Sequence, residues 1–497
     1  MQYDHWRIAD GYSSPVRPVI SGVTGAVSAA HPLAAAAAQD MLVRGGSAVD
    51  AAIAAQAVLC VVMPDACGIG GDLFALVDDG KDTMAVSGAG AAPRRGTGCA
   101  DDGANSITVP GLPGAWASMH DRWGKLPFSV ILSPAIRLAA EGIAVSEAMA
   151  LTVRTHAPRL KANGAASWSL LGLSAGERFV QKELAALLRL FVQQGPLCFY
   201  EGDMAASIAR AVAAQDGALD EADLAAHVTE VGPALAVALG ETTLFVQPPP
   251  TQGVLLGMTL RNFNRMPQAG ALQFDHIGVE LTEAAFAYRD RAAQDGAALL
   301  DVELEINPER ASRRGGPRAY LHTAGVAVAD SNGLVVSSLV SVFDDFGSCL
   351  LVPELGITLN NRAGGFTHGA NAWGPGRRPV HTLAPALLRS AQGRLALATP
   401  GADGQVQTLL QLIMRMMCEG EDLATAVAAP RWRSQGGKLL IEKGHPSEAG
   451  LAALGHDVEP MTPGATCFGA VVCAGVDDSG APFAVADWRR NTWAGVV

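Results

Sequence analysis

A hairpin pattern at residues 321–338 constrains the fold of this chain more than any other stretch. Valine-rich runs lie on both sides of residues 330–333, and β-branched side chains favour strands. Between these runs Asn332 is followed by Gly333, the dipeptide most typical of a tight hairpin turn. The sequence therefore predicts two antiparallel strands that are joined at this turn.

Thr323 opens the first predicted strand, shortly after a polar loop at residues 312–318. If the bond before Thr323 were cut, this residue would carry a free α-amine beside its own hydroxyl. Such an amine can take the proton that the hydroxyl must lose to act as a nucleophile. A threonine at a strand start is more often an ordinary strand residue, so the rest of the chain must decide between the two interpretations.

Composition narrows the class of protein. Of the 497 residues, 49% are hydrophobic and 17% are charged, which is typical of a soluble globular protein with a large buried core. The net charge of −12, without a basic run, argues against a nucleic-acid partner. The eight cysteines form no Cys-x-x-Cys pair, and no His, Asp or Glu spacing indicates a metal site. We therefore expect free thiols in a reducing compartment, with no metal and no cofactor.

The N-terminal residues contain no apolar segment of the signal-peptide kind. The longest apolar run, at about residues 51–63, is too short to cross a bilayer. These two features predict a cytoplasmic protein without a membrane partner.

Several short motifs follow one another in a fixed order along the chain. They are His-Pro-Leu-Ala at 31–34, Gly-Gly-Ser-Ala-Val-Asp-Ala-Ala at 45–52, Gly-Ile-Gly-Gly-Asp-Leu-Phe at 68–74, the hairpin itself, and Gly-Ile-Thr-Leu-Asn-Asn at 356–361. In this order they resemble the γ-glutamyltranspeptidase family of N-terminal-nucleophile hydrolases. The resemblance extends over about residues 22–475, nearly the whole chain.

The resemblance implies an α+β fold, the four-layer αββα sandwich, in which two antiparallel sheets pack face to face with helices outside. It also implies an inactive precursor that cleaves itself between His322 and Thr323. Residues 1–322 would form a large chain and residues 323–497 a small chain that begins with the nucleophile. The two products would stay associated, because their strands share the same sheets.

The resemblance also assigns the catalytic residues. Thr323 would form the acyl-enzyme, and Ser341 would place a hydroxyl against it, although Ser341 could also be an ordinary strand serine. The backbone N–H groups of Gly401 and Ala402 would stabilise the oxyanion. The family has two glycines at this last site, and it has Thr-His after the nucleophile where this chain has Ala-Gly.

The residues that bind the substrate depart from the family pattern. Enzymes that act on γ-glutamyl groups hold the amino-acid end of glutamate with an Arg, an Asp and a Ser-Ser pair. Here the corresponding positions are Ala89, the glycines at 364–365, and His381 with Thr382. Because charge-assisted contacts of this kind contribute strongly to recognition, we expect γ-glutamyl compounds to be poor substrates.

Cationic residues remain that could hold a small carboxylate. We prefer Arg362 and His381, with Thr382 beside them, because they lie at or next to family binding positions. Arg94 and Arg378 are alternatives, and both could be ordinary surface arginines, just as His381 could be a packed polar histidine. This anchor set resembles the amidohydrolase branch of the family, which includes oxamate amidohydrolase and acylases.

These patterns lead to one main hypothesis and two alternatives. The main one is a self-processing amidohydrolase whose partner is a small-molecule amide of a carboxylic acid. One alternative is a γ-glutamyl hydrolase or transferase that acts on glutathione-like compounds. The other is a non-catalytic scaffold that never matures, which Ala402 and the missing Thr-His would favour.

Overall fold

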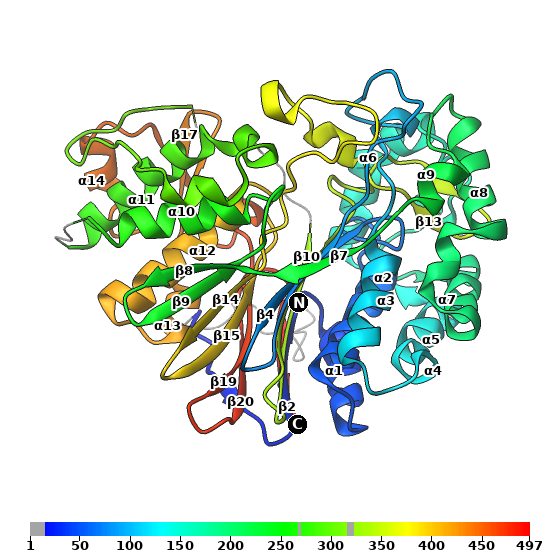
Figure 1. The fold of residues 1–497 in the computed structure, drawn as a ribbon, viewed down its shortest axis with the longest axis horizontal. Coiled ribbons are helices and arrows are strands. Elements are labelled where there is room, and N and C mark those ends of the chain that lie inside the picture. The colour runs from blue at the N-terminus through cyan, green and yellow to red at the C-terminus, as the bar shows by residue number, and fades with distance from the viewer. Residues whose placement is uncertain (1–14, 267–269, 316–322) are drawn as a thin grey trace, which may run out of the picture.

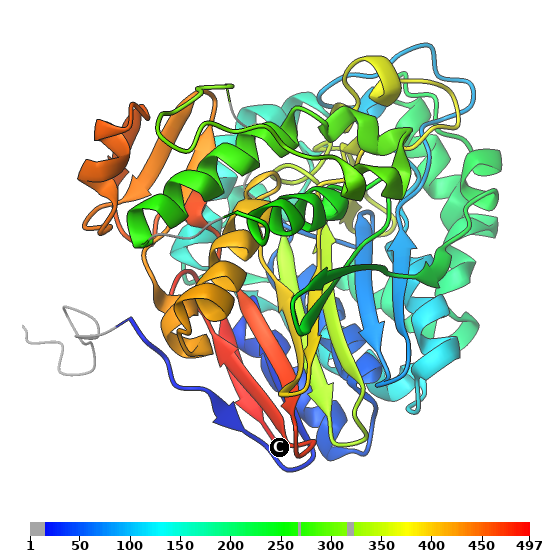
Figure 2. The ribbon, with the colours of Figure 1, turned by 60° about the vertical axis from the view of Figure 1, so that its left-hand side comes forward.

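Two seven-stranded antiparallel sheets form the centre of the molecule in the residues that the structure describes, 15–266, 270–315 and 323–497. The structure is a computed structural model, and Figures 1 and 2 show its two sheets with helices outside them. The first sheet contains the hairpin and has the order β21-β2-β10-β11-β3-β4-β7. Its strands are β21 (Trp493–Val496), β2 (Gly25–Ala29), β10 (Ala324–Asp330), β11 (Val335–Ser341), β3 (Asp72–Asp78), β4 (Thr83–Gly88) and β7 (Glu230–Pro233).

The second sheet has the order β1-β20-β19-β15-β14-β9-β8. Its strands are β1 (Ile20–Ser21), β20 (Pro482–Ala486), β19 (Val472–Asp477), β15 (Gly393–Ala398), β14 (Ala386–Ser390), β9 (Thr242–Val246) and β8 (Leu235–Leu239). Both sheets thus combine strands from before and after residue 323.

Helices cover the outer face of each sheet (Figure 1). The first sheet is covered by α1 (Pro32–Val43), α2 (Ala48–Val62) and α3 (Leu112–Trp123), with α4 (Phe128–Ile131), α5 (Ser133–Glu141), α6 (Glu147–Ala162), α7 (Lys182–Gln194), α8 (Gly202–Ala213) and α9 (Glu221–Ala225) beyond them. The second is covered by α10 (Gly253–Phe263), α11 (Ala271–Phe286), α12 (Gly404–Met414) and α13 (Leu423–Ala428). A small sheet of β16 (Trp432–Gln435), β17 (Lys438–Glu442) and β18 (Val458–Met461) lies with α14 (Glu448–Ala453) at the edge of this second layer.

Three hydrophobic cores fill the spaces between these layers. One joins the first sheet to its helices, one joins the second sheet to its helices, and one lies between the two sheets. This arrangement is the αββα sandwich, and it confirms the predicted fold class. Among the described residues no helix is both long and apolar enough to cross a membrane.

The sequence of β10 explains how its sheet can be buried on both faces. Val326 and Val328 belong to the core on the helix side, whereas Ala327 and Ala329 belong to the core between the sheets. Alternation along a strand sends successive side chains to opposite faces, so the small residues let the two sheets approach closely. At Gly325 the approach is so close that an added Cβ would lie 2.9 Å from Val472.

The predicted hairpin is confirmed. β10 pairs with β11 from Ala324 opposite Val340 to Ala329 opposite Val335. The Oδ1 atom of Asp330 accepts hydrogen bonds from the backbone N–H groups of Asn332 (2.9 Å) and Leu334 (3.1 Å) and so closes the turn.

Candidate active site

Three neighbouring strands of the first sheet bring Thr323, Ser341 and Asp72 into one row. Ser341 ends β11 and stands opposite Asp72, which begins β3. The pairing of β10 with β11 ends at Ala324 opposite Val340, so the next position, Thr323, lies opposite Ser341. Residues that are directly opposite in antiparallel strands point to the same face of the sheet. All three side chains therefore face the second sheet.

The two hydroxyls in this row are in contact. Thr323 Oγ1 lies 3.5 Å from Ser341 Oγ, which is longer than an ordinary O–H···O hydrogen bond. Ser341 Oγ also accepts a hydrogen bond from the backbone N–H of Phe343 at 2.9 Å. Thr323 is 2% exposed, so its hydroxyl is buried in the uncleaved chain. His322, the other residue of the predicted cleavage site, lies outside the described residues.

The predicted oxyanion turn follows β15 in the second sheet. Gly401 and Ala402 both have positive φ, 128° and 47°. Their carbonyl oxygens accept hydrogen bonds from Gly404 (2.8 Å) and Gln405 (3.0 Å), whereas their own N–H groups find no acceptor within the described part of the chain. The positive φ of Ala402 is uncommon for a residue with a side chain and explains why glycine suits this position.

The turn and Thr323 lie at the same end of the sandwich. A Cβ built on Gly325 would lie 3.5 Å from Ala398, so the beginning of β10 faces the end of β15. Thr323 is two residues before Gly325, and Gly401 is three residues after Ala398. The two N–H groups of the turn and the hydroxyl of Thr323 are thus brought to the same end of the two sheets.

Asp72, the third residue of the row, belongs to a buried polar cluster. The carboxylate oxygen Oδ2 of Asp72 accepts from Arg362 Nε at 2.9 Å and from His381 Nε2 at 3.1 Å. Arg362 Nη1 donates to Thr382 Oγ1 at 3.3 Å. The guanidinium also stacks on the ring of Phe343, 4.5 Å from its centroid. Arg362, His381 and Thr382, which the sequence analysis prefers as anchors, are therefore brought together, and Asp72 joins them.

The environment decides the charge of each group in this cluster. Burial, together with the charge of Arg362, lowers the pKa of His381 from 6.5 to about 3, so its imidazole is neutral at physiological pH. The ring then donates from Nε2 to Asp72 and accepts at Nδ1 from the backbone N–H of Leu383 at 3.2 Å. Burial alone raises the pKa of Asp72, but the hydrogen bond from His381 and the charge of Arg362 outweigh it and hold that pKa below its ordinary value. Treating His381 as a cation is thus wrong, and Arg362 carries the positive charge.

Two buried atoms of the cluster have no hydrogen-bond partner among the described residues. They are Nη2 of Arg362 and Oδ1 of Asp72. Buried polar atoms are nearly always paired, so an unpaired donor beside an unpaired acceptor indicates a place where a ligand can bind. Asp72 thus belongs to the site, although the motif at 68–74 did not identify it as a site residue.

Gln252 connects the cluster to the oxyanion turn. Its Nε2 donates to the carbonyl oxygen of Ala402 at 2.6 Å and, in a shorter contact, to the carbonyl oxygen of Thr382. The backbone around it pairs with His381, because His381 N donates to Pro250 O at 2.7 Å and Gln252 N donates to His381 O at 2.9 Å. Sequence analysis misses Gln252, since only the tertiary structure brings residues 252, 382 and 402 together.

The alternative cations line a cavity next to this cluster. Arg94 and Arg378 border a space of about 220 Å³, and Ala89 borders it too. Arg378 is ion-paired with Glu230. The pairing of β3 with β4 ends at Leu73 opposite Gly88, so the next position, Ala89, stands beside Asp72 in the same row as Thr323. The position where γ-glutamyl enzymes carry an arginine is therefore next to the buried cluster, but here it carries a methyl group.

Comparison with known proteins finds relatives that extend over most of this chain. The family model for gamma-glutamyltranspeptidase matches residues 34–497. The oxamate amidohydrolase proenzyme of Klebsiella pneumoniae is 33% identical over 491 residues, which cover 88% of this chain and 92% of the relative. The acylase ACY 1 proenzyme of Pseudomonas sp. strain SE83 is 31% identical, covering 91% of this chain and 90% of that protein. The crystal structure of cephalosporin acylase from Bacillus halodurans superposes with a TM-score of 0.88 at 26% identity, covering 100% of this chain and 99% of that one.

Proposed function

This chain belongs to the gamma-glutamyltranspeptidase family, and from that premise we propose that it is a self-processing amidohydrolase. Its substrate is an amide of a small carboxylate-bearing acid, and the reaction proceeds through an acyl ester on Thr323. The observation that carries the proposal is the row in which the Thr323 hydroxyl contacts Ser341, next to the Arg362–Asp72 pair. A hydroxyl nucleophile and a buried cation at one end of the sandwich are what such a substrate requires.

Self-processing begins when Thr323 Oγ1 attacks the carbonyl carbon of His322. The acyl group moves from nitrogen to oxygen, and water then hydrolyses the ester, which leaves Thr323 with a free α-amine. The 322 residues before the cut and the 175 after it stay together, because both sheets use strands from each side of the cut. Burial of the hydroxyl in the uncleaved chain is consistent with a precursor that cannot yet take up substrate.

In the mature protein the α-amine of Thr323 accepts the hydroxyl proton as Oγ1 adds to the substrate carbonyl. The N–H groups of Gly401 and Ala402 stabilise the oxyanion. The amine product leaves with the proton, and water hydrolyses the acyl ester to release the acid and restore Thr323. Ser341 supplies a polar contact to the nucleophile throughout these steps.

Arg362 is the residue that binds the substrate carboxylate in this proposal. Its Nη2 is buried and unpaired, and a guanidinium binds carboxylates with directional, charge-assisted hydrogen bonds. Asp72 Oδ1, which is also unpaired, would accept a hydrogen bond from a donor on the same substrate. A compound with an acceptor and an N–H close together would satisfy both atoms, as a short amide of a dicarboxylic acid does.

Mass spectrometry of the purified protein tests the nucleophile. We expect two chains that separate on a denaturing gel, the smaller beginning at Thr323. Thr323→Ala should give one intact chain that releases no ammonia from amides, and Thr323→Ser should restore slow cleavage. Thr259→Ala is the matched control, because this buried threonine of α10 bonds to Leu255 O, away from the proposed site. A Thr323→Ala chain that is still cut at the same bond, or an intact wild-type chain that hydrolyses amides, would contradict the proposal.

A panel of amides tests the substrate class separately. Ammonia release should be fastest for primary amides of short dicarboxylic acids and about 100-fold slower for the same amides without the carboxylate. A γ-glutamyl anilide should be turned over slowly, because Ala89 and the glycines at 364–365 offer no charged contact to its amino-acid end. Rapid turnover of the anilide would favour the γ-glutamyl alternative and leave the role of Thr323 intact.

A further inference from the structure

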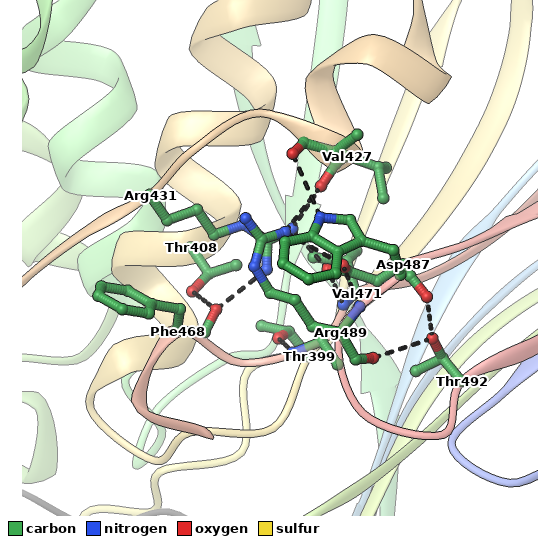
Figure 3. Close-up of polar contacts among 12 residues, drawn as sticks. Thr399, Thr408, Val427, Arg431, Phe468, Val471, Asp487, Arg489 and Thr492 are labelled. Atoms are coloured by element: carbon green, nitrogen blue, oxygen red, sulfur yellow. Dashed lines mark hydrogen bonds and ion pairs between the residues drawn. The ribbon is translucent and has the colours of Figure 1, made fainter. Parts of the chain in front are cut away.

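Two arginines and two carboxylates, Arg431, Arg489, Asp487 and Glu442, form a buried ring in the second half of the chain. Figure 3 shows Arg431, Asp487 and Arg489 of this ring. Asp487 Oδ2 pairs with Arg431 Nη2 at 2.6 Å, and its Oδ1 pairs with Arg489 Nη1 at 3.1 Å. Arg489 Nε donates to Glu442 Oε1 at 2.9 Å. Glu442 Oε2 accepts the backbone N–H of Arg431 at 2.8 Å and so closes the ring.

The ring holds one stretch of backbone, residues 464–471, which includes η9 (Thr466–Phe468). Glu442 Oε1 accepts from Gly464 N at 2.7 Å, and Arg431 Nη1 donates to Phe468 O at 3.0 Å. Asp487 Oδ2 accepts from Val471 N at 2.9 Å. Three members of the ring thus hold the beginning, the middle and the end of this stretch.

The same stretch packs against Thr399 and Pro400, the two residues before the oxyanion turn. Ala470 N donates to Thr399 Oγ1 at 3.3 Å. At Gly469 an added Cβ would lie 2.6 Å from Thr399 Oγ1 and 2.9 Å from Pro400 O, so backbone packs directly on backbone. Figure 3 shows Thr399 beside Val471 and Asp487 at this contact.

Arg433, in β16, strengthens the contact. Arg433 Nη1 donates to Cys467 O at 2.8 Å. A Cβ built on Gly401 would lie 3.5 Å from this Nη1 atom, and a Cβ built on Gly404 would lie 2.5 Å from it. The guanidinium is therefore packed between residues 464–471 and the turn.

We infer that Asp487 and Arg431 are positioning residues that act through residues 464–471 to hold the N–H groups of Gly401 and Ala402 in place. The inference rests on the proposed oxyanion role of these two residues. The turn needs support from outside because Ala402 has positive φ, a conformation that is unfavourable for a residue with a side chain. A ring of four ionic groups suits this task, since its directional hydrogen bonds fix the attached backbone in one geometry.

Asp487→Asn tests the inference, with Asp78→Asn as its matched control. Asp78 is a buried carboxylate that also pairs with two arginines, Arg389 and Arg394, but it ends β3 at the far end from Asp72. Both substitutions remove one buried ion-paired charge and should lower the thermal stability. Only Asp487→Asn should lower kcat, by about 100-fold and with KM changed less than about threefold, as expected for displaced oxyanion donors.

Hydrogen exchange gives a readout that does not depend on activity. The amides of Gly404 and Gln405 close the turn by donating to Gly401 O and Ala402 O, and they should exchange at least about tenfold faster in Asp487→Asn than in wild type. They should be unchanged in Asp78→Asn. Unchanged exchange in Asp487→Asn, equal effects of both variants, or faster exchange with unaltered kcat would overturn the inference.

A second variant keeps the test decisive if Asp487→Asn does not fold. Arg431→Lys keeps a positive charge beside Asp487, but one ammonium cannot also reach Phe468 O and Val427 O as the guanidinium does. It should show the same faster exchange and the same fall in kcat. If wild type hydrolyses no amide, the proposed function fails, and the exchange data still decide whether the ring holds the turn.

Discussion

Arg362 Nε lies 2.9 Å from Asp72 Oδ2, and neither side chain is exposed to solvent. This pair places a guanidinium beside the row of Thr323, but the arginine does not occupy the family position. It belongs to η6 (Arg362–Gly365), whereas the family position is Ala89, which follows β4 and lies opposite Asp72. A buried ion pair is costly to desolvate, so this pair adds little stability by itself.

Replacing Arg362 by lysine should weaken substrate binding while leaving chemistry nearly intact. Lysine can keep the contact with Asp72 but has no second nitrogen in the position of Nη2. We expect KM to rise about 100-fold, equivalent to about 2.7 kcal/mol, with kcat changed less than about threefold. Steady-state kinetics on a carboxylate-bearing amide measure both values. Arg394→Lys is the control, because Arg394 pairs with Asp78 at the end of β3 far from Asp72, and an equal effect there would show that Arg362 has no special role.

Removing the hydroxyl of Ser341 should slow the reaction of Thr323. Ser341→Ala deletes the side chain that contacts Thr323 Oγ1, so we expect both self-cleavage and kcat to fall about 10- to 100-fold, with KM little altered. Ser338→Ala, on the same strand, removes a buried hydroxyl that bonds to Gln56 and Val326 on the other face. That control should lower stability without slowing cleavage. The time course of the two bands on a gel decides between the expected results, and normal cleavage in Ser341→Ala would contradict the assignment.

Acid should destabilise the protein through His381. Burial and the charge of Arg362 lower its pKa in the folded chain to about 3, against 6.5 in the unfolded chain. The unfolded chain therefore binds a proton in this window that the folded chain does not, so the stability is full above pH 6.5 and is lost as pH falls toward 3. Between about pH 7.5 and about pH 5.5 the loss from this group should be on the order of 1 kcal/mol.

Chemical denaturation at the two pH values measures this loss. His381→Gln should flatten the pH dependence by about the same amount, and His368→Gln, at an exposed position, is the control for replacing a histidine. An unaltered pH dependence in His381→Gln would show that the folded imidazole is protonated like a free one.

Gln252→Ala should impair binding and chemistry together. The variant loses the hydrogen bonds to Thr382 O and Ala402 O, so both the anchor segment and the oxyanion turn can shift. We expect kcat/KM to fall about 100-fold, with contributions from both constants. Gln247→Ala is the control. This buried side chain, five residues before Gln252, also donates to two carbonyl oxygens, those of Ala75 and Val86 in the first sheet. A loss in KM alone would mean that Gln252 supports only the anchor segment.

Local sequence was sufficient to predict the framework. Residues 330–333 contain the turn chemistry of the hairpin, and Asp330 closes that turn in the structure. Ordered motifs identified the family and hence the αββα sandwich. These features depend on neighbours within a few residues or on motif order, and both can be read along the chain.

Only part of the candidate site could be predicted from the sequence. The resemblance pointed to Thr323, Ser341, Arg362 and His381, and the structure brings their side chains into one region. The roles of Asp72 and Gln252 could not be predicted, because they depend on the register between β11 and β3 and on contacts between residues more than a hundred positions apart. The charge of His381 was mispredicted for the same reason.

The sequence by itself determined the hairpin and the family, since turn and motif residues act locally. Only the tertiary structure decided that His381 is neutral, that Asp72 joins Arg362, and that residues 464–471 pack against Thr399 and Pro400. Burial and charge pairing are properties of the assembled molecule, because the dielectric around a group is set by all the atoms that exclude water from it.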